Sequence, residues 1–511
     1  MYIQPNSVIK LLTNCPLDDS YDHTLYFSNA SAQASYFTGL TKYNFIAQTY
    51  QRHTNNTLRV QVLADNIFDC NYLMFQNTSY GNKWFYAFVK EVTYLNNSVS
   101  EIEYEIDVMQ TWLFDYELEE CFVEREHSIT DNIGDNLVPE KLDTGDYISS
   151  SLQDTGVLGG VSLVVSATVK EEGGEIIDVG GAYYGGRFSG TYYTVFSDSM
   201  SGASECAEFL LKIVEAGKEN SIVSVFTMPS ALVTSLGFPA NNYTVTYNKK
   251  YIDIDGYNPK NKKLFTSPYN TLYVTNYQGT GVEFPFEYFN TFSCKFIVTG
   301  DMSDGCTAVL APINYKNDGD IPNYDEKMTL SCGNLCSYAT DAYKSWLAQN
   351  GLSTAFNALS TGALGVAGAS LLTNPVGQSI AVAGAVVGVA SSIAQYRERT
   401  LLPYQAKGAS GGATPEIIGI QDFGFMNKHI RAEFAKIIDS YFDMFGYATH
   451  KVKTPNIDSR PYWNYVKLGT VVLTGTLPAS DSKKVESIYK NGVTFWKNGA
   501  NVGNYSLDNS P

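Results

Sequence analysis

The residues with the clearest potential for chemistry lie near Ser410. The motif GASGG places this serine between glycines at the spacing of a nucleophile elbow, and His429 and His450 follow it in the sequence. An elbow needs a strand before the serine and a helix after it, whereas here a glycine follows directly and Pro415 is close. The pattern is more typical of a flexible linker, so we do not expect the chain to be an enzyme.

Motifs for metal binding or acid catalysis are equally weak. The histidines show no HExxH or HxH spacing; they are His23, His53, His127, His429 and His450. Two acidic pairs could hold calcium or serve as glycosidase carboxylates, although turns rich in Asp and Gly look the same. These pairs are Asp253 with Asp255 and Asp318 with Asp320. The sequence therefore predicts no metal and no cofactor.

The composition is that of a soluble globular protein with a strong negative charge. The chain has 511 residues, which is enough for several domains, and its net charge is -17. Such a charge is repelled by nucleic acid and by anionic membrane surfaces, so we do not expect a protein that reads DNA sequence. The start lacks a signal-peptide pattern and the eight cysteines are scattered. We therefore expect free thiols and folding in a cytoplasm.

Most of the chain has the pattern of β-strands. From residue 84 to 123, two β-rich runs flank the turn-forming pair Asn96 and Asn97, which predicts a long hairpin. Within SEIEYEIDV, apolar and acidic residues alternate, so the acidic side chains share one face of a strand. These acidic residues are Glu101, Glu103, Glu105 and Asp107. Such a face is more often simply solvated than functional, because antiparallel sheets commonly keep one side wet.

Changes in composition divide the chain into four parts. Residues 1–149 and 401–511 are β-rich, with a helical pattern in FMNKHIRAEFAKIIDSYFDMFGY that stops at Gly446. Residues 150–341 have short strands, Gly-rich turns and one helix near 204–216, which indicates a separate, mainly β domain. Residues 342–400 are apolar. The fold class we predict is α+β, mainly β with some α, in several domains.

The apolar part has the features of a membrane-active hairpin. No charged residue lies between Lys344 and Arg397, and Pro375 separates two arms, 352–372 and 376–396. Each arm has about the 20 residues that span the ~30 Å core of a bilayer. The aromatic and basic anchors expected at a lipid boundary are Trp346, Tyr396, Arg397 and Arg399. The apolar residues of the loop are Leu352, Phe356, Leu359, Leu364, Val366, Leu371, Leu372, Pro375, Val376, Ile380, Val382, Val386, Val387, Val389 and Ile393.

The same hairpin is a poor constitutive membrane segment. It is dominated by Ala, Gly, Ser and Thr, whereas Leu, Ile, Phe and Val are the residues that favour insertion. Each glycine costs a helix in water about 1 kcal/mol relative to alanine. These features suggest a segment that is stored in a protected place and released later. From the residues alone, a helical pair buried between domains or subunits carries equal weight.

Three blocks of the sequence resemble the tail knob proteins of small short-tailed bacteriophages with protein-primed genomes. The blocks are LLTNCPLDDSYDHTLYFSNASAQASYF near the start, WFYAFVKEVTYLNNSVSEIEYEIDVMQTWLFDYELEECFVEREH before residue 150, and DSYFDMFGYATHKVKTPNIDSRPYWNYVK with NGVTFWKNGANVGNYSLDN near the end. They occur in the same order as in that family. The segment 150–341 resembles the family less clearly.

The resemblance implies a structural protein of the virion tail tip, made in the cytoplasm of the bacterial host. The implied assembly is a homo-hexameric, β-barrel-type tube of the N- and C-terminal portions, with the middle domain inserted. The implied partners are further tail proteins, as in a lower collar or the tube above, the host cell membrane, and viral DNA in the lumen. The hydrophobic loops would plug this lumen and exit to form a pore. As a hypothesis, Glu101, Glu103, Glu105 and Asp107 face the bore, where carboxylates would let DNA slide.

Other classes of function fit the sequence less well. A secreted-type pore-forming protein would also store a hairpin, but such proteins usually have a secretory signal and an alternating β-hairpin. A tail-associated adhesin or hydrolase remains an alternative for the middle domain, in which pairs of tyrosines could stack on sugars. These pairs are Tyr183 with Tyr184 and Tyr192 with Tyr193. Packing inside the domain is the commoner use of such residues.

Overall fold

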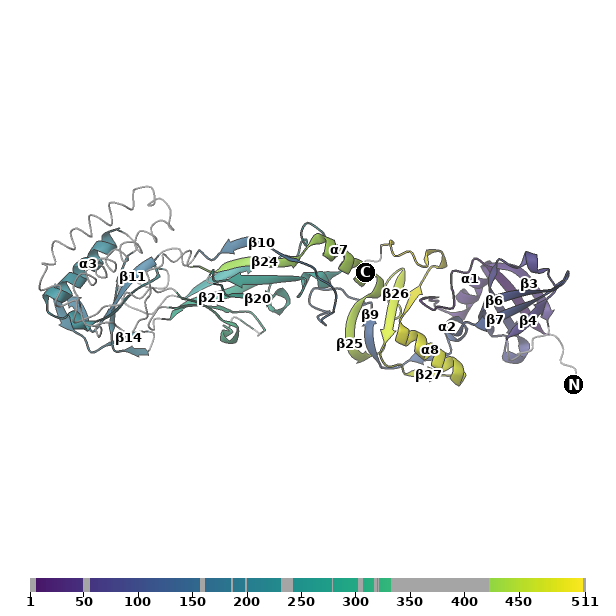
Figure 1. Cartoon of the computed structure of the whole chain (residues 1–511). Helices are drawn as coiled ribbons and strands as arrows, with labels where there is room; N and C mark the ends of the chain where they lie inside the picture. Colours follow the sequence, from purple (N-terminus) through teal and green to yellow (C-terminus); the bar gives the residue numbers. More distant parts are fainter. Residues whose placement is uncertain are drawn as a thin grey trace, which may run out of the picture. The chain divides into compact units, whose positions relative to one another are not determined.

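The structure is a computed structural model in which the chain forms two compact units (Figure 1). The first unit joins Met1–Asp146, Asp253–Thr266 and Ile430–Pro511, and the second joins Tyr147–Ile252 and Ser267–His429. The residues that the structure describes are 6–48, 56–156, 161–184, 187–197, 200–230, 242–277, 279–301, 307–316, 319, 321–331 and 422–508.

The N-terminal part of the first unit is a six-stranded antiparallel sheet in the order β3-β1-β5-β6-β7-β4. Its strands are β1 (Ser7–Thr13), β3 (Thr41–Gln48), β4 (Thr57–Val60), β5 (Cys70–Asn77), β6 (Trp84–Asn96) and β7 (Val99–Ile106). One face of all six strands contributes to a single core that includes Ile9, Leu73 and Ile102. β6 and β7 form the hairpin predicted around Asn96 and Asn97, so that prediction is confirmed.

Two helices and a second sheet complete the first unit. α1 (Ala30–Gly39) begins where the Asn29 side chain accepts a hydrogen bond from the Ala32 amide, as expected of an N-cap. α1 and α2 (Val108–Trp112) pack on the other face of the six-stranded sheet, in a core that also contains Trp463 and Trp496. The second sheet, ordered β2-β28-β26-β9-β25, consists of β2 (His23–Leu25), β9 (Cys121–Glu126), β25 (Tyr447–Lys453), β26 (Trp463–Leu468) and β28 (Val493–Trp496).

Two C-terminal helices accompany the second sheet of this unit. α8 (Ala479–Asn491) adds Val485 and Tyr489 to the core with Trp463, and a short pair, β8 (Tyr116–Leu118) with β27 (Leu473–Gly475), lies in the same unit. α7 (Ala432–Phe445) ends at Gly446, which has a φ of 65°. A Cβ atom at this position would lie 2.2 Å from the Glu126 backbone oxygen, so only glycine fits.

The second unit is built on a sandwich of two four-stranded sheets. One sheet has the order β10 (Tyr147–Asp154), β24 (Gly424–Ile430), β19 (Asn270–Thr275), β20 (Gly281–Pro285). The other has the order β18 (Tyr243–Asn248), β21 (Ser293–Asp301), β22 (Thr307–Pro312), β23 (Met328–Ser331). Aromatic rings from both sheets form one core, with Phe296 packed 5.2 Å from Phe284 and 5.0 Å from Phe425 between ring centroids.

A smaller layer of the second unit pairs one sheet with one helix. The sheet has the order β16 (Tyr192–Phe196), β11 (Val161–Ala167), β17 (Ile222–Pro229), and α3 (Met200–Glu215) packs on it through Phe209 and Ile213. Two hairpins accompany this layer: β12 (Val169–Glu172) with β13 (Glu175–Asp178), and β14 (Ala182–Tyr184) with β15 (Arg187–Ser189).

The predicted fold class is confirmed at the level of a mainly β protein with some α-helix and several parts. The helical pattern assigned to FMNKHIRAEFAKIIDSYFDMFGY is wrong in its first part, where β24 forms a ladder with β19 before α7 begins at Ala432. Pairing with β19 outweighs the local helical periodicity there. The predicted loop at 342–400, with its anchors, lies outside the described residues. In the part of the chain that the structure describes, no helix combines the length and apolarity needed to cross a bilayer.

Candidate functional site: a buried polar network and an acidic strand face

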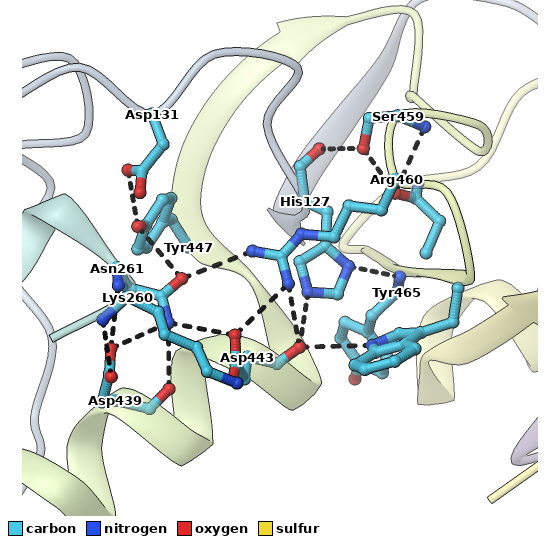
Figure 2. A network of polar contacts seen from close by, with 12 residues as sticks. His127, Asp131, Lys260, Asn261, Asp439, Asp443, Tyr447, Ser459, Arg460 and Tyr465 are labelled. Carbon is cyan, nitrogen blue, oxygen red and sulfur yellow. Dashed lines mark hydrogen bonds and ion pairs between the residues drawn. The ribbon is translucent and has the colours of Figure 1, made fainter. Parts of the chain in front are cut away.

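A buried polar network joins three distant segments of the first unit (Figure 2). The segment Asp253–Thr266 lies between two parts of the second unit in the sequence, yet it belongs to the first unit. Its residues Tyr257 and Asn261 contact α7, and Lys262 contacts the loop after β9. The network therefore holds Asp253–Thr266 in the first unit, although its neighbours in the sequence belong to the second unit.

Asp439 of α7 is the main acceptor for this segment. Its Oδ2 accepts hydrogen bonds from the Tyr257 hydroxyl at 2.7 Å and from the Lys260 amide at 2.9 Å. Its Oδ1 accepts from both the amide and the side chain of Asn261, each at 2.9 Å. Asp439 is 1% exposed. A buried carboxylate with four donors is fully satisfied, and hydrogen bonds to an ionised group are the stronger kind.

The last turn of α7 is tied to the chain before β26. The backbone oxygen of Asp443 accepts hydrogen bonds from Arg460 Nη1 and from the Trp463 indole, both at 3.2 Å. The Asp443 carboxylate lies 3.6 Å from Arg460 Nη1, and Lys260 Nζ donates to it at 3.2 Å. Carbonyl groups at the end of a helix lack partners within the helix. These side chains supply such partners and place positive charge at the negative end of the helix dipole.

His127 is held in one neutral tautomer at the centre of the network. The Tyr465 amide donates a hydrogen bond to His127 Nδ1 at 2.7 Å, so Nδ1 carries no proton. The proton is therefore on Nε2, which lies 3.1 Å from the Asp443 backbone oxygen and donates to it. Burial, followed by the nearby Arg460 charge, holds the pKa of His127 well below its usual value. The imidazole is thus a neutral structural link.

Asp131 and Glu140 connect the same segment to the loop after β9. Asp131 accepts hydrogen bonds from the Tyr447 hydroxyl at 2.7 Å and from the Lys262 amide at 2.9 Å, and burial raises the pKa of this carboxyl. Glu140 forms ion pairs with the buried side chains of Lys263 and Arg125. Burial lowers the pKa of Lys263. Glu140 and Lys263 thus pair opposite charges in a buried place, whereas Asp131 is satisfied by neutral donors.

This arrangement holds segments of the first unit together. Its acceptors face backbone amides, hydroxyls or cations of the same unit, and no described group of His, Cys, Asp and Glu side chains is arranged to hold a metal ion. Asp255 accepts from the Ala432 amide at the start of α7, and Asp253 accepts from the Gly256 amide within its own turn. Of the pair considered for calcium or glycoside chemistry, Asp253 therefore stabilises its own turn, and Asp255 accepts from the first turn of α7.

The second candidate site is the row of acidic residues on β7. Glu101, Glu103 and Glu105 alternate along the strand with the buried residues Ile102 and Tyr104, so they share one face. Glu101 forms an ion pair with Arg59 at 2.8 Å. Glu105 forms ion pairs with Lys484 and, at 3.6 Å, with Lys90.

Glu103 faces a like charge. It lies directly opposite Glu91 of β6, and both side chains are exposed. In the described residues, neither carboxylate has an ion pair. Directly opposed like charges in an antiparallel pair are destabilising. The exposed acidic face is defined here as Glu91, Glu101, Glu103 and Glu105. Glu101 and Glu105 have cation partners, whereas the opposed pair Glu91 and Glu103 is arranged against the stability of the unit.

Asp107 does not belong to this face, although the alternation in the sequence placed it there. β7 ends at Ile106, and Asp107 caps α2 by accepting from the Gln110 amide at 3.1 Å. Its other oxygen accepts from the Tyr72 hydroxyl at 2.8 Å, and the residue is 1% exposed. Burial raises the pKa of this carboxyl to about 6. The alternation of apolar and acidic residues does not predict the position of Asp107 because β7 ends at Ile106 and helix α2 begins directly after Asp107.

The remaining predicted residues are scattered. Ser410 and the second acidic pair, Asp318 and Asp320, lie outside the described residues, as do the loop residues and their anchors. His429 is buried in β24, with Nε2 3.0 Å from the Ser150 hydroxyl. The exposed His450 stacks on Phe122 at 6.1 Å between ring centroids. These two histidines belong to different units.

Sequence reasoning missed the polar network, although one signal pointed to it. Asp439 and Asp443 are four residues apart on the face of α7 that also buries Ala435, Ile438 and Phe442. Two aspartates on an otherwise apolar helix face are unusual, because buried carboxylates need partners. The partners of the Asp439 carboxylate come from a segment more than 170 residues away. The sequence therefore indicated that this carboxylate needs partners but not which residues they are.

Comparisons with known proteins agree over the length of the chain. Residues 237–510 match the family model described as Bacillus phage phi29 tail knob protein gp9, C-terminal domain. Residues 5–117 match the model described as caudoviral major tail protein N-terminus. The tail knob proteins gp9 of Bacillus phages B103 and phi29 are 26% and 24% identical to this chain, each over 98% of both sequences.

A solved structure gives the same picture of the fold. The tail knob protein gp12 of bacteriophage C1 aligns with a TM-score of 0.59 and 16% identity, over 98% of this chain and 99% of that one. At this identity the likeness concerns the fold alone. It extends over both units of the present chain.

Proposed function

This chain belongs to the family of the phage tail knob protein gp9, and on that premise we propose that it forms a ring-shaped conduit for DNA at the tip of a virion tail. A structural role in the tail follows from the family, whose members are tail knob proteins and not enzymes. The proposal goes further, to a ring of six copies whose lumen passes DNA. Its partners are other copies, further tail proteins such as a lower collar or the tube above, the host membrane and the viral DNA.

The observation that carries the conduit is the exposed acidic face of the six-stranded sheet. Glu91 and Glu103 face each other without a cation, an arrangement that costs stability. DNA carries one negative charge per ~1.7 Å of its axis, so a basic lumen would retain it and an acidic lumen would let it slide. We place the exposed acidic face toward the lumen. Passage through the lumen involves no recognition of base sequence.

The membrane step is assigned to the apolar part of the chain, residues 342–400. Its support is the sequence alone: no charged residue lies between Lys344 and Arg397, and two arms of membrane-spanning length flank Pro375. In the proposed cycle these loops plug the lumen in the free virion and exit to form a pore in the host membrane. The other proposed domain limits are 1–149 and 401–511 for the tube and 150–341 for the knob.

The polar network has a role in this cycle. Ejection of DNA and exit of the loops exert force on the tail tip, and the segment Asp253–Thr266 is a short excursion into the first unit. Asp439, Asp131 and Glu140 hold this segment through hydrogen bonds and ion pairs. Such contacts are directional and resist sliding. The network would therefore keep the segment in place while other parts of the chain move.

A dye-release assay tests the membrane step. The assembled full chain is added to liposomes at neutral and acidic pH, beside a variant in which residues 352–396 are replaced by a short Gly/Ser linker. We expect dye release by the full chain only, with both proteins forming the same ring. Absence of release under all conditions, or a deletion variant unable to assemble, would instead identify the apolar part as buried core of the ring.

A further inference from the structure

Two glycines lie in one row on the outer face of a sheet in the second unit. Val274 of β19 faces the core of the sandwich, so Tyr273 and Thr275 point to the opposite, outer face. Gly281 of β20 and Gly424 of β24 lie directly opposite Thr275, one on each side of it. Because neighbouring strands are about 4.8 Å apart, the two glycines are about 10 Å apart. This row leaves two places on the outer face where the sheet itself has no side chain.

A tyrosine ring covers each of these glycines. A Cβ atom on Gly281 would overlap the Tyr273 hydroxyl and lie 2.7 Å from Cε2 of the same ring. A Cβ atom on Gly424 would overlap the Tyr277 hydroxyl and lie 2.7 Å from Cζ of that ring. Rings that come so close to a glycine lie along the sheet instead of standing up from it. Tyr277 is 39% exposed and Tyr273 is half-buried, so both rings keep surface toward the solvent.

Hydrogen-bonding groups flank the two rings. The Tyr277 hydroxyl donates a hydrogen bond to the exposed Asp154 at the end of β10. Glu283 of β20 lies directly opposite Tyr273 and forms an ion pair with Lys428 of β24. Because β19 lies between β20 and β24, this ion pair spans the outer face. The face therefore combines aromatic surface with carboxylates and an ammonium group, and the charge of that ammonium group is neutralised by its partner.

We propose that this face binds a polysaccharide of neutral pyranose units, with Tyr273, Thr275 and Tyr277 as a tyrosine platform. One side of a pyranose ring is a flat layer of C–H groups with partial positive charge, and an aromatic ring is negative on its face. The hydroxyl groups at the edge of the sugar need donors and acceptors, which Asp154 and the ion pair of Glu283 supply on the same face. Two rings in one row can contact separate units of one sugar chain.

Other classes of ligand fit the tyrosine platform less well. An anionic polymer would meet the carboxylates of Asp154 and Glu283 and a chain with a net charge of -17. A protein partner buries a contiguous apolar centre, whereas Thr275 separates the two rings here. The proposal goes beyond the conduit and does not depend on it, because a single chain holds every residue of the platform.

Binding of the full chain to an array of immobilised oligosaccharides tests the tyrosine platform. The array carries neutral hexose and N-acetylhexosamine oligosaccharides beside anionic ones, and we expect binding to neutral members. Tyr273→Ala and Tyr277→Ala should each raise the Kd at least about tenfold, because each removes one stacking ring. Tyr273→Phe keeps the ring and should bind as wild type does. The matched control is Tyr324→Ala, at a residue of η7 (Tyr324–Glu326) in the same unit that is 49% exposed.

Gly281→Ala separates a binding platform from simple packing of the ring. The new Cβ atom displaces the Tyr273 ring without removing it, and the displaced atoms are the far end of a flexible side chain. Thermal unfolding should therefore change little, while the Kd should rise at least about tenfold.

Three results would overturn the proposal. They are a wild-type chain that binds no member of the array, a preference for anionic members, and a Kd unchanged by Tyr273→Ala, Tyr277→Ala and Gly281→Ala. Thermal unfolding of each variant shows whether the second unit remains folded. Sedimentation velocity of the same proteins reports ring formation separately, so failure of the platform and failure of the proposed conduit are distinguishable.

Discussion

Asp439 is the main acceptor of the polar network, and replacing it tests why the segment Asp253–Thr266 stays in the first unit. In Asp439→Asn the side chain keeps its shape but exchanges one carboxylate oxygen for an NH₂ group. If the remaining oxygen serves Asn261, the new NH₂ faces two donors, the Tyr257 hydroxyl and the Lys260 amide. Two hydrogen bonds to the carboxylate are lost. The Lys260 amide is left facing a donor, and the Tyr257 hydroxyl keeps a partner only by turning to accept from the new NH₂ group.

The size of the effect follows from these two donors. The Lys260 donor left without an acceptor costs about 1–3 kcal/mol. Exchanging the Tyr257 hydrogen bond to a carboxylate for a neutral one costs about 1 kcal/mol more, so the sum is about 2–4 kcal/mol. Lys260 is exposed and its amide can turn to water, which favours the lower half of that range. We expect about 3 kcal/mol. For a unit of this size that corresponds to a fall in Tm of about 6–12 °C.

The assay is calorimetric unfolding of the full chain, with hydrogen exchange to locate the change. Amides of residues 253–266 should exchange faster in Asp439→Asn, whereas those of the six-stranded sheet should change less. Ser440→Ala is the matched control, because Ser440 is the exposed neighbour on α7. Tyr257→Phe removes one of the two altered hydrogen bonds in advance, so in a double-mutant cycle Asp439→Asn should cost about 1 kcal/mol less in that background. A change in Tm no larger than that of Ser440→Ala would refute the reasoning.

Three further predictions concern single titratable groups. The folded pKa of His127 lies below its unfolded value of about 6.5, so the unfolded state binds more protons as pH falls. The free energy of unfolding should therefore drop below pH 6.5, by up to about 1.4 kcal/mol per pH unit. His127→Gln should remove that slope in denaturant titrations. The folded pKa of Asp107 is raised to about 6, so its carboxyl stabilises the fold at low pH and loses that contribution as the pH rises from about 4 to 6. Between about pH 4 and pH 7, the free energy of unfolding of Asp107→Asn should therefore rise relative to that of wild type by up to about 3 kcal/mol. Glu103→Gln should raise the free energy of unfolding by about 0.2–1 kcal/mol by removing the repulsion from Glu91, and a loss of stability would contradict this.

Local patterns predicted what depends on neighbours in the sequence. The alternation in SEIEYEIDV gave the strand β7 and the face shared by Glu101, Glu103 and Glu105, because a pleat has a period of two. Asn96 and Asn97 gave the hairpin. Asp107 was misplaced because a strand ending and a helix cap look alike in an alternating pattern. The first half of the predicted helix before Gly446 proved to be β24, because pairing with β19 is not visible locally.

Local sequence patterns could not predict the polar network, for a physical reason. His127, Asn261 and Asp439 come from three separate parts of the sequence, and their partnership exists only after the chain has folded. What the sequence did contain was a pair of aspartates, four residues apart, on a face that had to be buried. The composition of the apolar loop, in contrast, suggested a membrane function but did not indicate which fold carries the loop.

Electron cryomicroscopy of the assembled protein tests the central claim most directly, because it locates the exposed acidic face in the ring. We expect Glu91, Glu101, Glu103 and Glu105 to line a continuous bore wide enough for duplex DNA. A map in which these four carboxylates lie on the outer wall, or in which the copies enclose no bore, would contradict the proposal that this chain conducts DNA.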